Sequence, residues 1–161
     1  MNNFLFLKTR MWRYQCLLMA MLVSLLMPHE HVFAGIDFLS ISDDAVIMYD
    51  APSLKAEKLF VASRFLPVEA VVNVEDWVKV RDSSGIFAWV EKKSLSSKRY
   101  IIVTVPQTDV FQAADTNSGV VFQVEKNVVM EWLDSTRTGW VKVRHLDGQI
   151  GYIRVSQVWG I

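Results

Sequence analysis

One pentapeptide occurs twice in the chain and constrains the fold more than any other sequence feature. The segment WVKVR at residues 77–81 reappears unchanged at residues 140–144, which sets a spacing of 63 residues. Carried along the chain without a gap, this spacing also aligns Trp89 with Tyr152. The repetition predicts a duplicated unit that fills most of the chain. We place the two copies at residues 36–98 and 99–161.

Both copies carry the pattern of an all-β fold. Short segments rich in valine, isoleucine and aromatic residues alternate with turn residues, and helical periodicity is scarcely visible. This pattern predicts that each copy is a small all-β barrel or sandwich. The strands are expected near residues 38–41, 46–49, 67–74, 77–81 and 86–91, and again near 100–105, 110–111, 128–133, 140–144 and 150–154.

The repeated pentapeptide is expected to be a strand that ends in a hairpin turn. Residues 82–85 and 145–148 supply Asp, Ser and Gly, which tight turns favour. Because successive side chains of a strand point to opposite faces, the two valines of WVKVR should enter the core. Trp77 and Trp140 then lie on the outer face, where each indole packs over the barrel end, packs against the neighbouring repeat, or contacts a ligand.

The N-terminal 34 residues are similar to a secretory signal peptide. A basic opening with Lys8, Arg10 and Arg13 precedes an apolar run at residues 16–27, and the small residue Ala34 ends a typical cleavage pattern. An uncleaved anchor is the alternative, but the run is shorter than the ~20 residues that cross a bilayer. We therefore expect a signal peptide at residues 1–34, export to the periplasm or cell envelope, and no stable membrane span in the mature protein.

The cysteine content and the charge balance limit the disulfides and the partners that the mature chain can have. Cleavage would remove Cys16, the single cysteine, so the mature chain would fold without a disulfide. Residues 35–161 contain 14 Lys and Arg against 16 Asp and Glu, which is nearly neutral. Such a balance lacks the basic stripe that nucleic acids require, so we expect no nucleic-acid partner.

Several motifs together resemble the bacterial SH3 family. They are VIMYDAPS at residues 46–53, WVKVR at 77–81, and Gly85 followed by Ala88-Trp89-Val90. The second copy is similar, with Gly151 in place of Ala88, although the gapless alignment puts Gln112 at the position of Tyr49. The resemblance implies two tandem SH3-like barrels that bind cell-wall peptides or other proteins.

The residues give little support to catalysis or metal binding. His145 is the only histidine after residue 34, and we expect it to be a solvated turn residue. No second histidine or cysteine is available to complete a zinc site, and no Ser-His or Cys-His pair can be assembled with a credible orienting carboxylate. Adjacent acids such as Asp43-Asp44 are typical turn formers. We therefore expect no catalytic residues, no metal, no cofactor and no enzymatic activity.

Aromatic side chains are the candidate ligand-binding groups, since rings supply contact area at little entropic cost. Three functional hypotheses follow. The first is recognition of peptidoglycan stem peptides, the second is a periplasmic scaffold for an envelope protein, and the third is a cell-wall hydrolase of unrecognised type. The predicted ligand-binding residues are Tyr49, Trp77, Phe87, Trp89, Trp140 and Tyr152.

Overall fold

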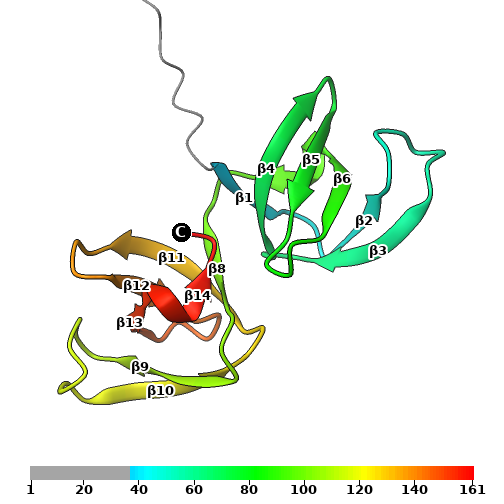
Figure 1. Cartoon of the computed structure of the whole chain (residues 1–161). Helices are drawn as coiled ribbons and strands as arrows, with labels where there is room; N and C mark the ends of the chain where they lie inside the picture. The colour runs from blue at the N-terminus through cyan, green and yellow to red at the C-terminus, as the bar shows by residue number, and fades with distance from the viewer. Residues whose placement is uncertain (1–36) are drawn as a thin grey trace, which may run out of the picture. The chain divides into compact units, whose positions relative to one another are not determined.

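A computed structural model describes residues 37–161 of the chain, which belong to one compact unit, Gly35–Ile161. The predicted signal peptide at residues 1–34 lies outside the described residues. Residues 37–161 form two antiparallel sheets of seven strands each (Figure 1). The predicted all-β class is confirmed. No helix within residues 37–161 is long and apolar enough to span a membrane.

The first sheet contains the first copy of the repeat and is called the first barrel below. Its strand order is β3-β2-β6-β5-β4-β1-β7. A short 3-10 helix, η1 (Lys92–Ser94), leads into its last strand. The strands are β1 (Asp37–Ile41), β2 (Ala45–Tyr49), β3 (Lys58–Ser63), β4 (Pro67–Val74), β5 (Trp77–Arg81), β6 (Phe87–Glu91) and β7 (Leu95–Ser96).

The second sheet, called the second barrel, has the equivalent order β10-β9-β13-β12-β11-β8-β14. The 3-10 helix η2 (Val155–Gln157) occupies the place of η1. The strands are β8 (Tyr100–Val103), β9 (Gln107–Phe111), β10 (Val120–Glu125), β11 (Val129–Ser135), β12 (Trp140–Arg144), β13 (Ile150–Arg154) and β14 (Val158–Trp159).

Each sheet curls around its own core because its longer strands all send side chains to the same interior. The predicted inward valines of WVKVR are confirmed: Val78 and Val80 are 1% exposed, and Val141 and Val143 are fully buried. The first core also contains Ile41, Val46, Met48, Ala62, Val68, Ala88 and Val90, and the second also contains Ile101, Val103, Val110, Val124, Met130, Ile153 and Val158.

The predicted hairpin turns are also confirmed. The Gly85 N–H donates to the Asp82 carbonyl at 3.0 Å, and the Gly148 N–H donates to the His145 carbonyl at 2.9 Å. Both glycines have positive φ, 89° and 97°, which glycine adopts without a steric penalty. The turns therefore join β5 to β6 and β12 to β13 as expected.

The strand assignment missed the two-residue strands β7 and β14. It also missed β3 and β10, which pair with β2 and β9 and form one edge of each sheet. Edge strands have one neighbour, so their apolar residues need not alternate with polar ones. On β3, Leu59 and Val61 are 43% and 61% exposed. The hydrophobic alternation used to find strands is accordingly weak there.

The gapless spacing of 63 residues is wrong for the first half of each copy. Tyr49 pairs with Trp89, whereas Phe111 pairs with Tyr152, so Tyr49 corresponds to Phe111 and not to Gln112. Glu69 and Glu131 likewise occupy equivalent places, opposite Arg81 and Arg144. The reason is a turn between β11 and β12 that is one residue longer than the turn between β4 and β5. The spacing is therefore 62 before this turn and 63 after it.

Gly151 in β13 tests how closely the second barrel is packed. A Cβ at this position would lie 2.6 Å from Val110 Cγ1 and 2.7 Å from the Phe111 carbonyl oxygen. Because backbone cannot move aside cheaply, we expect Gly151→Ala to lower the free energy of unfolding by about 1–3 kcal/mol in urea denaturation. The matched change Ala88→Gly in the first barrel should cost no more than about 1 kcal/mol. An unchanged midpoint for Gly151→Ala would contradict this packing.

Candidate functional site

The outer face of β5 and β6 gathers three aromatic side chains in the first barrel. Trp77 begins β5, and its ring contacts the Tyr49 ring edge-on, with centroids 5.4 Å apart and planes at 86°. Trp89 is the backbone partner of both Tyr49 and Lys79. The predicted residues Tyr49, Trp77 and Trp89 are thus brought together. Tyr49 is only 6% exposed, whereas Trp77 and Trp89 are half-buried, so the two indoles are more accessible than the Tyr49 ring.

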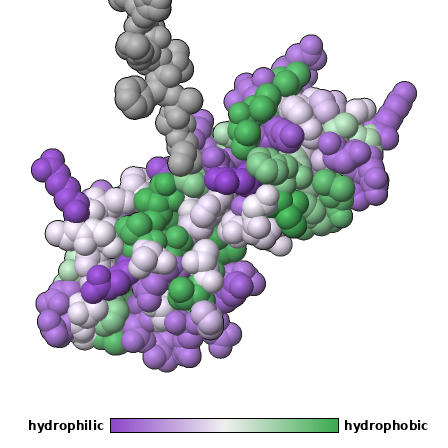
Figure 2. Space-filling model, in the orientation of Figure 1, coloured by the Kyte–Doolittle hydropathy of each residue, from purple (hydrophilic) through white to green (hydrophobic). Residues whose placement is uncertain are grey.

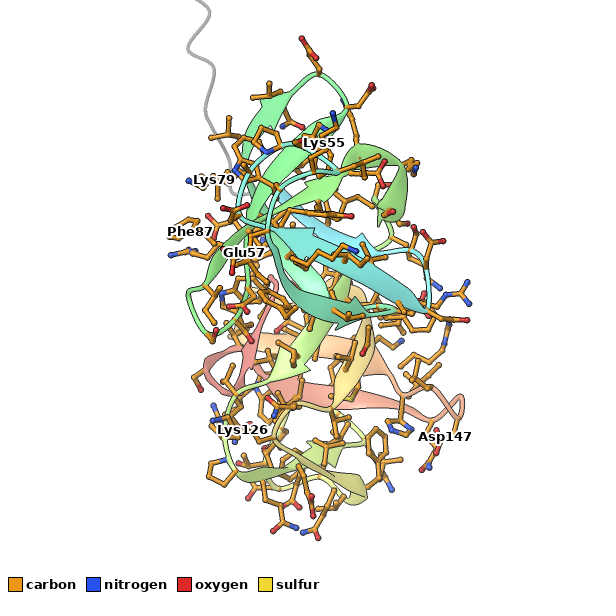
Figure 3. All side chains as sticks on the ribbon, turned by 90° about the vertical axis from the view of Figure 1, so that its right-hand side faces the viewer. Lys55, Glu57, Lys79, Phe87, Lys126 and Asp147 are labelled. Atoms are coloured by element: carbon orange, nitrogen blue, oxygen red, sulfur yellow. The ribbon has the colours of Figure 1, made fainter. Side chains whose placement is uncertain are left out.

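Phe87 extends this aromatic face toward the hairpin turn. The ring is 50% exposed, and the Lys79 ammonium lies 5.5 Å from its centroid. Figure 3 shows Lys79 and Phe87 beside one another on the outside of the first barrel. Arg81, the cross-strand partner of Phe87, forms an ion pair with Glu69. The face therefore alternates rings with cations, which suits a ligand that has both apolar and polar groups.

A small acidic pocket adjoins the Tyr49 end of this face. Its volume is about 190 Å³, and Asp43 and Glu91 supply carboxylates to its wall. The Lys93 ammonium lies 2.8 Å from Glu91, and this hydrogen bond raises the pKa of Lys93. Glu91 therefore already holds one ammonium group. The other lining residues are Ala45, Val46, Ile47, Tyr49 and Ser94.

The second barrel has an equivalent aromatic pair, but its tryptophan is buried. Trp140 contacts Phe111 edge-on at 5.7 Å and 87°, which repeats the Trp77–Tyr49 geometry. Trp140 is only 4% exposed, and the Arg154 guanidinium lies 4.6 Å from its centroid. The residue opposite Trp77 is instead Glu91. An arginine thus lies over one indole, whereas the cross-strand partner of the other is a glutamate that lines the acidic pocket.

Two residues of this arrangement bear on the sequence predictions. Phe111 was missed because the gapless alignment placed Gln112 there; the extra residue before Trp140 was the available signal. Tyr152 is half-buried, with the Lys142 ammonium 5.9 Å from its centroid. Ligand binding by the six predicted aromatic residues stays a prediction, and the burial of Trp140 and Tyr49 favours packing roles for these two.

Two family models match the chain, one for each barrel. Residues 42–97 match a bacterial SH3 domain model, and residues 106–158 match a second bacterial SH3 domain model. The chain belongs to the bacterial SH3 domain family. The predicted resemblance is confirmed, and the two barrels are two SH3 domains in tandem.

Three solved structures are similar to these SH3 domains at 16% sequence identity. NlpC2 and NlpC1 from Trichomonas vaginalis each give a TM-score of 0.37, and cover 79% and 82% of this chain. An NlpC/P60 family protein from Bacillus cereus gives 0.35 and covers 76%. The matched regions are 49%, 48% and 55% of those proteins, so this chain spans about half their length. No curated protein sequence matches the chain significantly.

His145 lies in the β12–β13 turn of the second SH3 domain, where the sequence predicted it. Its Nδ1 is 2.9 Å from the Asp147 carboxylate. The backbone N–H of Gln149, followed by its side-chain amide, lowers the pKa of Asp147 to about 2. Asp147 is thus an ionised turn former at ordinary pH. Within residues 37–161, no three His, Cys, Asp or Glu side chains gather in a way that could hold a metal ion.

The different burial of the two indoles gives a stability test. We expect Trp140→Ala to lower the free energy of unfolding of the second SH3 domain by about 3–5 kcal/mol, because it removes a buried ring. Trp77→Ala should cost the first domain less, since that ring is only half-buried. Urea denaturation followed by circular dichroism measures both. Equal losses would contradict the packing role of Trp140.

Proposed function

We propose that this chain is a non-catalytic binding module of the cell envelope whose first SH3 domain recognises peptidoglycan stem peptides. The observation that carries the proposal is the continuity of the aromatic face with the acidic pocket at Tyr49. A stem peptide is short and carries free amino and carboxyl groups along a partly apolar backbone. Rings would cover its apolar part, and Asp43 and Glu91 would accept an ammonium group.

The first domain is the better candidate because its site is open. The second domain lacks an acidic group opposite its indole, where Arg154 lies over Trp140. An ammonium of the ligand would be repelled by that guanidinium, whereas in the first domain Asp43 would attract it beside Glu91, whose carboxylate also pairs with Lys93. The second domain would then support the first or bind another group of the envelope.

Location at the envelope is part of the proposal. The basic opening, apolar run and small residues of positions 1–34 support export, and the near-neutral composition of residues 35–161 disfavours nucleic acids. Absence of catalysis is also proposed, on the basis that the chain after residue 34 has a single histidine, held in a turn by Asp147, and no cysteine.

Co-sedimentation with isolated sacculi tests the proposal. Protein lacking residues 1–34 should pellet with sacculi, and Phe87→Ala should weaken binding about ten-fold, since exposed aromatic anchors dominate such interfaces. Asp43→Asn should weaken it as well, through the ammonium subsite. Leu146→Ala is the matched control, because Leu146 is an apolar residue, 63% exposed, in a turn of the other domain. Wild-type protein that stays in the supernatant would refute the proposal.

A protein partner is the second candidate function, and one surface favours it. Val71, Val72 and Val74 on β4 are 46%, 42% and 42% exposed. Figure 2 shows apolar surface along this strand. Exposed apolar rows of this kind suit protein–protein contact. Crosslinking in intact cells that recovers one envelope protein, together with failure to bind sacculi, would favour this function over the first.

A further inference from the structure

A second pocket, lined by the first SH3 domain, the connection to the second and Tyr100 of β8, has chemistry opposite to that of the acidic one. Its volume is about 360 Å³, and no carboxylate lies among its lining residues. The walls come from the end of β1, the turn between β3 and β4, and the connection from β7 to β8. The lining residues are Ser40, Ile41, Ser42, Arg64, Phe65, Ser96, Lys98 and Tyr100.

Two cations supply the charge of this pocket. Arg64 lies 3.4 Å from Asp44 and Lys98 lies 3.2 Å from Glu131. The Arg64–Asp44 pair is long and exposed, so it restrains the guanidinium weakly. The hydrogen bond to Glu131 raises the pKa of Lys98, which keeps the ammonium charged. Each cation has more donors than its one acidic neighbour uses.

Serine hydroxyls add neutral donors between the cations. The Ser96 hydroxyl oxygen accepts from the Lys98 backbone N–H at 3.1 Å, which leaves its own proton free to donate. The Ser40 hydroxyl is buried and donates to the Lys98 carbonyl at 2.7 Å, so it fixes the connection that carries Lys98. Ser42 places a third hydroxyl in the wall.

A stack of rings holds the two cations in place. Phe65 and Tyr100 stack with centroids 4.5 Å apart and planes at 21°. The Arg64 guanidinium lies 5.1 Å from the Phe65 centroid, and the Lys98 ammonium lies 5.4 Å from the Tyr100 centroid. Cation–π attraction therefore orients both charges before any ligand enters.

The backbone of Phe65 is strained at this pocket. Its φ is 68°, a left-handed conformation that bulky residues rarely adopt. The equivalent residue of the second domain, Asn127, has a φ of 70°, and asparagine tolerates this region well. The first domain thus has phenylalanine at a position where the second domain has asparagine, which adopts this conformation more readily. Strain of this kind is typical of functional positions.

The polar wall is particular to the first domain. Ser40 pairs with Ser96 between β1 and β7, whereas the equivalent pair between β8 and β14 is Ile102 with Trp159. The duplicated unit therefore has hydroxyls in one copy and apolar side chains in the other. Each copy has its own core of equivalent apolar residues, although only the first copy has the two serines. Folding of the repeated unit therefore does not by itself require these serines.

We infer that this pocket binds a carboxylate group, held by Arg64, Lys98 and the hydroxyls of Ser42 and Ser96. A singly charged anion fits better than a dianion, because Asp44 and Glu131 already offset the two cations and would repel a second negative charge. We take the ligand to be the terminal carboxylate of a cell-wall peptide. That identity rests on the proposed function, whereas the carboxylate site is supported by its own residues.

An NMR titration of the protein lacking residues 1–34 tests the inference. The probe is N-acetyl-D-alanyl-D-alanine, whose blocked amine cannot use the acidic pocket, and its C-terminal amide is the matched probe. We expect the free acid to shift the backbone amides of Ser42, Ser96 and Lys98, and the amide to leave them unchanged. Arg64→Gln should weaken binding of the acid about five-fold or more.

Lys126→Gln is the matched control, since Lys126 precedes Asn127 as Arg64 precedes Phe65 in the first domain. It should leave the affinity unchanged. Equal shifts from acid and amide, undiminished binding by Arg64→Gln, or tighter binding of inorganic phosphate than of the acid would each overturn the inference. Shifts by the acid without sedimentation on sacculi would refute the proposed function and leave the carboxylate site standing. Sedimentation on sacculi without shifts by the acid would refute the carboxylate site and leave the proposed function standing.

Discussion

Burial of one row of side chains from each long strand is the constraint on which both domains depend. No disulfide is available in residues 37–161, so the two small cores must hold the sheets curled by packing alone. The paired valines of WVKVR take the inward positions, and β-sheet alternation then forces tryptophan, lysine and arginine outward. The aromatic face is consequently a by-product of core packing, which places rings and cations side by side without a separate structural device.

The two domains share one set of structural interactions but have different surfaces. The Glu69–Arg81 and Glu131–Arg144 ion pairs and the edge-on aromatic pairs recur in both domains, so they belong to the shared set. The residues that differ lie around these pairs. Glu91 opposes one indole and Arg154 the other, and the Ser40–Ser96 pair of the first domain is replaced by apolar residues in the second. The first domain thereby has an acidic pocket and an aromatic face, and it supplies most of the basic pocket, which Tyr100 of the second domain completes.

Most of the fold was predictable because its signals are local. Alternation within WVKVR and the glycines at 85 and 148 depend only on neighbours in the chain, and both predictions hold. The edge strands β3 and β10 were missed because a strand with one partner and exposed apolar residues has no clear alternation. The equivalence of Tyr49 and Phe111 was missed because one additional residue in a turn shifts everything before it.

The sequence by itself determined that the chain repeats one β-rich unit, which residues of its central hairpin face inward, and where the glycine turns lie. These properties follow from side-chain periodicity and from the conformational freedom of single residues. Only the tertiary structure decided that Trp140 is covered whereas Trp77 is half-buried, and that Phe65 meets Tyr100 beside two cations. The physical reason is that burial and pocket charge depend on residues from strands far apart in the chain, whose register is set by turn lengths and bulges rather than by local pattern.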